Sequence, residues 1–317
     1  MTGAGAFAPD QWAVILGGSS GFGLATARKL AEHGMNLCLV HRDRRGAMAR
    51  IEAEFEKIRG MGVRLLSMNT DALDAGRRVA VLDELAAALG EEGRVRVLLH
   101  SIAFGNLKLL VQEVPRERGV ARALSEKLGL EEARLRAAAD ELFLAGADGA
   151  LGVASPPVYS QEHFLDEEDF SRTIHNMGTS LLGWVQEIFR RGLFTADARV
   201  FGLTSEGNEI AWKGYAAVAA AKVSLESLAR SIAIEFAPYG IRCNVIQAGV
   251  TETPALAAIP GSAHMKASAR LRNPFGRLTT PRDVANVIYL LSTDDAAWVN
   301  GVVLRVDGGE HVSGVMA

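Results

Sequence analysis

One run near the start of the chain restricts the fold more than any other. The apolar residues 12–16 lead into a glycine-rich run, residues 17–23, after which small and apolar side chains recur at helical spacing up to Gly34. We therefore predict a strand, a tight glycine turn and a helix. Such a turn lets an anionic ligand approach the backbone, and the first N–H groups of the helix attract negative charge. The spacing, with glycines at 17, 21 and 23, departs from GxGxxG, so an ordinary turn stays possible.

The rest of the chain repeats this alternation of strand and helix. Helical periodicity separates apolar segments that we interpret as strands, at residues 36–40, 63–68, 94–99, 199–204, 241–246 and within 302–309. The pattern predicts an α/β fold: a Rossmann-type, doubly wound parallel sheet of about seven strands with helices on both faces. We expect a single domain over about residues 11–317, preceded by a loose tail, residues 1–10.

Composition narrows the choice of partner and compartment. With 34 basic and 37 acidic residues interspersed along 317 positions, the chain shows no polycationic face, which argues against nucleic acid or an anionic membrane as a main partner. There is no basic leader and no run of 18 apolar residues, so we expect a soluble, cytoplasmic protein. Cys38 and Cys243 lie in apolar strand-like runs, which is typical of buried, reduced thiols.

No metal-ligand spacing stands out in the sequence. Glu162 and His163 precede the acidic residues 166–169, but we interpret this run as a solvated loop and the negative first turn of a helix rather than as a metal site.

The residues that follow the second and third strands bear on a dinucleotide. His41 and Arg42 come directly after the second strand, where an acidic side chain would hold a ribose diol and an arginine would accommodate a 2′-phosphate. We therefore expect NADPH rather than NADH, although Asp43 and a plain solvated charge run leave the alternative open. Asp71, after the third strand, would hydrogen-bond adenine or cap the next helix.

A Tyr and a Lys follow the fifth strand. On the predicted helix, Tyr215 and Lys222 are seven positions apart, so their side chains would share one face about 10 Å apart. A phenol can give a proton to a developing oxyanion, and a nearby ammonium would lower its pKa. Such a pair also occurs by chance in many helices. The surrounding sequence is what makes a catalytic role credible.

The sequence resembles a known family at several of these points. The glycine turn, Asp71, the Tyr/Lys helix and the ending VVLRVDGG, residues 302–309, are similar to the short-chain dehydrogenase/reductase superfamily. The sequence HSIAF, residues 100–104, and the six residues between Tyr215 and Lys222 resemble the enoyl-acyl-carrier-protein reductases. Most other members place the tyrosine four positions before the lysine, where this chain has Val218. The resemblance covers nearly the whole chain outside about residues 106–165.

The resemblance implies that Tyr215, Lys222 and Ser205 are catalytic. It also implies a set of cofactor-binding residues, drawn from the glycine turn, the strand ends and the segment after the sixth strand: Gly17, Ser19, Ser20, Gly21, Phe22, Gly23, His41, Arg42, Asp71, Ala72, Ser101, Ile102, Ala103, Lys222, Gly249, Val250, Thr251 and Thr253. Thr251 or Thr253 would hold the carboxamide or the diphosphate.

The implied reaction is reduction of an enoyl thioester. Hydride then goes to the β-carbon and charge appears on an oxygen two carbons further along, so the tyrosine must stand further out than in ketone reduction. Moving it from position 218 to Tyr215 has that effect. Ser205 is a departure from the enoyl reductases: it stands where many of them carry a second tyrosine and where ketone reductases carry their catalytic serine, which keeps ketone reduction open, as well as a plain strand-end serine in a turn. Asn176 or Met177 falls at the proton-relay asparagine of ketone reductases. A non-catalytic NADP(H) sensor is a third possibility.

Two segments would shape the substrate side. Residues 106–165 exceed the family's usual connection, and Leu124, Leu128, Leu135 and Leu142 follow a helical pattern interrupted at a glycine, so we expect an inserted helical lid or oligomer contact. Residues 250–275, with few anchoring side chains, would form a loop that covers the substrate. The expected partners are an acyl thioester, carried by coenzyme A or acyl carrier protein, and further copies of the chain in a tetramer or dimer.

Overall fold

The computed structural model describes residues 6–114 and 119–314. A seven-stranded sheet, parallel throughout, forms its centre in the order β3-β2-β1-β4-β5-β6-β7. The predicted fold class is confirmed. Because the order reverses between β1 and β4, a crevice opens there at the carboxyl ends of the strands. The strands are β1 (Gln11–Leu16), β2 (Asn36–His41), β3 (Leu65–Asn69), β4 (Arg94–His100), β5 (Phe194–Ser205), β6 (Ile241–Ala248) and β7 (Val303–Val306).

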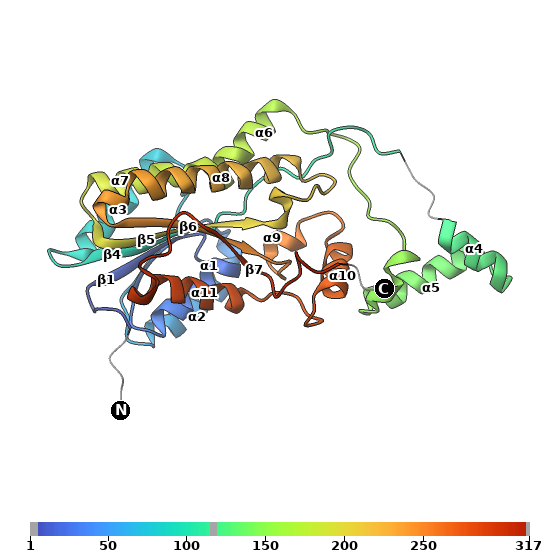
Figure 1. Ribbon diagram of the computed structural model, residues 1–317, viewed down its shortest axis with the longest axis horizontal. Helices are drawn as coiled ribbons and strands as arrows, with labels where there is room; N and C mark the ends of the chain where they lie inside the picture. Colours follow the sequence, from blue (N-terminus) through green and yellow to red (C-terminus); the bar gives the residue numbers. More distant parts are fainter. Residues whose placement is uncertain (1–5, 115–118, 315–317) are drawn as a thin grey trace.

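Helices cover both faces of the sheet (Figure 1). One layer contains α1 (Gly21–Ala31), α2 (Met48–Arg59) and α11 (Pro281–Ser292), and the other contains α3 (Ala75–Leu89), α7 (Ser180–Arg190) and α8 (Ala216–Glu235). Along β1, Val14 faces the α3/α7/α8 layer whereas Ala13 and Ile15 face the other. Since both faces are covered there, the central strands β1 and β2 are buried along almost their whole length and consist mainly of apolar residues.

The helix that begins at the acidic run, residues 166–169, is interrupted. It consists of α6 (Glu167–Ile174), a π-helical turn (His175–Thr179) and α7. The acidic run does form the first turn of α6, where Asp166 accepts a hydrogen bond from the N–H of Asp169. A π-turn changes the direction in which successive side chains point, and such turns often mark functional sites. Here it presents Met177 toward the carboxyl edge of the sheet.

The inserted segment is helical and lies to one side of the sheet. It contains α4 (Gly119–Leu128), α5 (Glu132–Leu144) and a 3-10 turn (Asp148–Gly152), which Figure 1 shows beyond the strand ends. Gly129, with φ of 63°, separates α4 from α5 as the sequence indicated. Phe143 and Ala154 pack against Ala267, which belongs to α10 (Ser262–Arg272).

The expectation of a loosely anchored loop over residues 250–275 was wrong. This segment forms two helices, α9 (Pro254–Ala257) and α10, and Arg270 of α10 makes two hydrogen bonds, 2.5 and 2.6 Å long, to the Asp148 carboxylate of the inserted segment. The insert and the predicted substrate cover are therefore joined to each other.

Part of the predicted tail is packed. Phe7 is buried and meets the Tyr289 ring of α11 edge to face, so residues 6–10 do not form a loose tail, and residues 1–5 lie outside the described residues. Within the described part of the chain, no helix is long and apolar enough to cross a membrane. Shorter 3-10 turns occur at Arg45–Ala47, Glu206–Asn208, Ala237–Tyr239 and Asp294–Ala296.

Candidate active site

Two adjoining cavities, each of about 400 Å³, lie along the carboxyl ends of the strands. We call the one beside residues 17–22 the glycine-turn cavity and the one beside Tyr215 the tyrosine cavity. Both are lined by residues 101–104 and by Thr253, so together they form one continuous cleft. Every site residue expected from the sequence lines this cleft except Gly23.

Gly23 and Gly17 instead shape the turn itself. Gly17 has φ of 88°, and a Cβ there would lie 2.4 Å from the Ser101 carbonyl oxygen. A Cβ on Gly23 would lie 2.1 Å from the Gly17 carbonyl oxygen, so no larger residue lets α1 start so close to the turn. The Ser20 side chain makes no capping bond, which leaves the start of α1 open to the cavity. This arrangement fits a dinucleotide diphosphate.

Arg42 lines the glycine-turn cavity. Its guanidinium donates to Asp71 at 2.7 Å, stacks over the Phe104 ring and remains half exposed. His41 is buried and bonds through its two ring nitrogens to Asp43 and Ser67. The first charged side chain past β2 that projects into solvent is thus a cation.

Asp71 does not cap α3. One carboxylate oxygen accepts from Leu73 N–H and the other from Arg42, while Asp74 is the N-cap and accepts from Arg77 N–H. The expectation that Asp71 caps this helix was therefore wrong.

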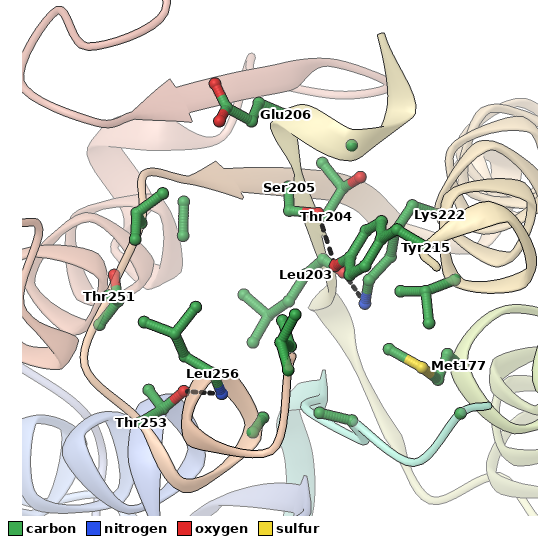
Figure 2. A pocket seen from close by; sticks show the side chains of 18 of the residues that line it. Met177, Leu203, Thr204, Ser205, Glu206, Tyr215, Lys222, Thr251, Thr253 and Leu256 are labelled. Carbon is green, nitrogen blue, oxygen red and sulfur yellow. Dashed lines mark hydrogen bonds between the residues drawn. The ribbon is translucent and has the colours of Figure 1, made fainter. Parts of the chain in front are cut away.

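Ser205, Tyr215 and Lys222 meet in the tyrosine cavity, as Figure 2 shows. Tyr215 Oη lies 3.3 Å from Ser205 Oγ, and Lys222 Nζ donates to the Leu203 carbonyl oxygen at 2.9 Å. Tyr215 is the residue before α8, with φ of −111° and ψ of 3°. The prediction that it lies within the helix was therefore wrong. Leaving the helix lets its ring reach back to the end of β5.

The pKa of the phenol moves opposite to the sequence expectation. Burial raises the pKa of Tyr215, Ser205 partly opposes this by its hydrogen bond, and the nearby Glu206 raises it further. Lys222 does not lower it. Burial also lowers the pKa of Lys222 to about 8. Before any ligand enters, the phenol therefore keeps its proton and can serve as a hydrogen-bond donor.

Gly207 is a site residue that the sequence reasoning missed. A Cβ at this position would lie 2.5 Å from Tyr215 Cε1 and 2.8 Å from its Cδ1, so the tyrosine ring occupies the space that a side chain would need. The only signal in the sequence was a glycine two residues after Ser205. Gly207 therefore permits the ring to lie against the Ser205 turn.

The remaining walls of the tyrosine cavity are mostly apolar. Val218, at the position where most superfamily members carry their tyrosine, is buried and lines the cavity. Of the two candidates for the relay position, Met177 lines the cavity, while the Asn176 side chain donates to the Phe104 carbonyl oxygen. Further apolar lining comes from Leu107, Leu203, Trp212, Val250, Leu256, Ile259 and Met265.

Two threonines lie where the cavities join the loop after β6. Thr251 Oγ1 donates to the Gly249 carbonyl oxygen, and Thr253 Oγ1 accepts from Leu256 N–H as the N-cap of α9. Thr253 lines both cavities and so lies where a bound dinucleotide would pass.

Among residues 6–114 and 119–314, no cluster of three or more His, Cys, Asp or Glu side chains is arranged to hold a metal ion.

A doubly wound sheet with a glycine turn and a Ser–Tyr–Lys group at its strand ends defines the class of Rossmann-type oxidoreductases. Comparison with known families agrees. The chain matches the model described as short chain dehydrogenase over residues 11–128 and the model described as Enoyl-(Acyl carrier protein) reductase over residues 146–311, which is 166 of 317 positions. The chain belongs to the short-chain dehydrogenase/reductase superfamily and is an oxidoreductase.

Relatives of nearly full length carry several activities. The chain is 28% identical over 303 residues to cis-4-hydroxycyclohexanecarboxylate dehydrogenase of Sinomonas cyclohexanicum, covering 95% of this chain and 96% of the relative. It is 26% identical over 298 residues to (2S)-[(R)-hydroxy(phenyl)methyl]succinyl-CoA dehydrogenase subunit BbsC of Thauera aromatica, covering 94% and 93%.

Solved structures share the fold. An enoyl-(acyl-carrier-protein) reductase from Anaplasma phagocytophilum in complex with NAD has a TM-score of 0.68 at 17% identity, covering 100% of this chain and 97% of that one. A short chain dehydrogenase from Burkholderia cenocepacia in complex with NADP has a TM-score of 0.68 at 20% identity, covering 95% and 98%.

Proposed function

We propose that this chain reduces the C2=C3 double bond of an α,β-unsaturated acyl thioester, with NADPH as the hydride donor. The observation that carries the proposal is the position of Tyr215. Its hydroxyl lies beside Ser205 from a residue ahead of α8, while the inert side chain of Val218 fills the position four residues before Lys222.

The chemistry follows from where charge develops. When hydride reaches C3, the electron pair of the double bond moves toward the thioester carbonyl and leaves negative charge on its oxygen. Tyr215, which burial keeps protonated, donates a hydrogen bond to that oxygen. A proton then goes to C2, which completes the saturated thioester. Ser205 is positioned to pass a proton to the phenol or to steady its hydroxyl.

Lys222 has a supporting role in this proposal. Its ammonium donates to the Leu203 carbonyl oxygen and lines the tyrosine cavity, where it would reach a cofactor ribose. Apart from Lys222 and Glu206, the described lining of this cavity carries no charged side chain. A mainly apolar pocket favours an uncharged acyl chain.

The choice of NADPH depends on Arg42. Its guanidinium is held at the wall of the glycine-turn cavity by Asp71 and Phe104, and half of the side chain stays open to solvent. A 2′-phosphate would find a planar cation already oriented there.

Reduction of a 3-oxoacyl thioester is the second candidate. A serine hydroxyl 3.3 Å from a tyrosine hydroxyl is also the arrangement that ketone reduction requires, and the two full-length relatives are named as dehydrogenases. The position of Tyr215 and the turning away of the Asn176 amide favour the enoyl substrate.

A direct comparison of substrates tests the proposal. The purified chain is mixed with NADPH and either crotonyl or acetoacetyl thioester, each on coenzyme A and on acyl carrier protein, and the loss of NADPH absorbance is followed. We expect faster oxidation with the crotonyl thioester on at least one carrier. Faster oxidation with acetoacetyl thioester on both would overturn the proposal in favour of ketone reduction.

A further inference from the structure

Three charged side chains form a buried cluster at the wall of the tyrosine cavity, which one of them, Glu206, lines. Arg272 Nη2 donates to both carboxylate oxygens of Glu206, at 2.9 and 3.1 Å, and lies 3.3 Å from Glu310 Oε1. The exposed fractions are 14% for the Arg272 side chain, 10% for Glu206 and 2% for Glu310. We call this group the Glu206–Arg272–Glu310 cluster.

The cluster joins segments that are distant in the sequence. Glu206 directly follows Ser205, Arg272 ends α10, and Glu310 belongs to the segment after β7. The second Glu310 oxygen accepts from Val250 N–H at 3.3 Å, and Val250 lines the tyrosine cavity. The Glu310 carboxylate thus contacts Arg272 of the substrate cover and the Val250 N–H of the cavity wall. Through Arg272 it is also linked to Glu206, which follows Ser205.

The charges in the cluster do not balance. Two carboxylates share one guanidinium, and Arg272 Nε is buried with no hydrogen-bond partner among the described residues. The pKa of Glu310 is raised to about 7, first by burial and then by Glu206 and, more weakly, Asp307, against the opposing effects of Arg272 and the Val250 N–H. Glu310 is therefore half protonated near neutral pH, and its ionised form is destabilising for the fold.

We propose that Glu310 is a positioning residue: its ionised carboxylate holds the Val250 main chain and Arg272, and through Arg272 the turn Glu206–Asn208, which follows Ser205 and against which the Tyr215 ring lies. The proposal rests on the proposed function, because it places this turn in the reduction. In the ionised form both oxygens accept hydrogen bonds. Protonation turns one oxygen into a donor, which breaks the contact with Arg272 or with Val250 and loosens the turn.

The test compares Glu310→Gln with the control Glu209→Gln. The amide keeps the size of the carboxylate but cannot ionise. Glu209 lies nearby at an exposed position and pairs with Arg305 and with His311. We expect kcat for the better thioester to fall about tenfold in Glu310→Gln above pH 7, and the acid limb of the wild-type pH profile to disappear. Glu209→Gln should retain both the rate and the limb. An unchanged acid limb in Glu310→Gln would overturn the proposal.

A second readout does not need turnover. NADPH affinity is measured by cofactor fluorescence at about pH 6 and about pH 8 for both variants, so that titration of the cofactor phosphate cancels between them. As the pH rises from about 6 to about 8, we expect the NADPH affinity of Glu209→Gln to increase several-fold more than that of Glu310→Gln. Equal pH dependence in the two variants would contradict the positioning role. If the wild type reduces neither thioester, the proposed function fails, while this comparison still decides the role of Glu310 at the Val250 wall.

Discussion

The two halves of the cleft are built in different ways. The glycine-turn cavity is shaped by backbone: Gly17 and Gly23 leave room for main-chain atoms of neighbouring segments, and α1 begins at the cavity edge. The tyrosine cavity is shaped by side chains from β5, α8, the π-turn and the α9–α10 segment. A backbone requirement allows few residue types, whereas a side-chain wall can be built from many.

This difference also separates binding from chemistry. The glycine-turn cavity is lined by a half-exposed cation, Arg42, whose charged form is solvated and therefore carries little free-energy penalty. The tyrosine cavity holds a buried phenol and a buried ammonium. Burial raises the pKa of Tyr215 and lowers the pKa of Lys222, so it favours the neutral form of each group. We therefore expect substitutions in the first half to change cofactor affinity and substitutions around the Tyr215 phenol to act mainly on turnover or its pH dependence, whereas the Val250 wall would contribute to both.

Replacing Gly207 by Ala should strongly reduce turnover without a direct change to a catalytic side chain. The new methyl group would lie 2.5 Å from the Tyr215 ring and force the ring away from Ser205. A misplaced proton donor loses on the order of 100-fold in kcat, about 2.7 kcal/mol. Steady-state kinetics with the better thioester measures this loss, and fluorescence titration checks that NADPH still binds. If NADPH affinity fell as much as kcat, the division between the two halves would not hold.

Lys222→Met tests the buried charge of the tyrosine cavity. The folded-state pKa of Lys222, about 8, lies below its usual value of 10.5, so the ammonium destabilises the fold below pH 8, and this penalty fades as the pH rises from 8 to 10.5. We expect the variant to gain about 2 kcal/mol in unfolding free energy at pH 7 and much less at pH 10. Urea denaturation at the two pH values measures the gain, while turnover should be lost. A destabilised variant at pH 7 would refute the assignment.

Arg42→Ala should act on the other half alone. Losing the cation at the 2′-phosphate position should raise the Kd for NADPH about tenfold and leave that for NADH unchanged. Isothermal titration with both cofactors measures the two constants. Equal losses for the two cofactors would mean that Arg42 does not select between them.

The smallest effect is expected where the insert meets the substrate cover. Arg270→Ala removes a partly buried ion pair with Asp148, which is worth about 1 kcal/mol. We expect faster proteolytic cleavage within α10 and only a small drop in the melting temperature. Limited proteolysis of Arg270→Ala beside the similarly paired surface variant Arg277→Ala provides the comparison. Equal cleavage of the two would show that the contact does not hold the cover.

The same contrast explains what could be predicted from the sequence. The sheet and the glycine turn were predicted correctly, because buried parallel strands and tight turns leave a local pattern, and the strand-end residues line the cleft. The position of Tyr215 ahead of α8 was not predicted, because the Ala-rich sequence that follows it favours a helix. Its raised pKa depends on burial, which no spacing reveals.

Tertiary contacts were the other missing information. The Glu206–Arg272–Glu310 cluster joins residues up to 104 positions apart, and Gly207 matters only because the Tyr215 ring lies against it. The order in residues 250–275 likewise depends on the insert, through Arg270. The sequence therefore predicted the structure of the glycine-turn cavity better than that of the tyrosine cavity.

The most direct test of the account is single-turnover reduction of crotonyl thioester by Tyr215→Phe at saturating NADPH, beside wild type and Ser205→Ala. In the proposed reaction the phenol meets the charge on the thioester oxygen, so removing its hydroxyl should slow reduction by about a thousandfold without changing NADPH affinity, and Ser205→Ala should cost far less. A Tyr215→Phe chain that reduced crotonyl thioester at the wild-type rate would contradict the central claim.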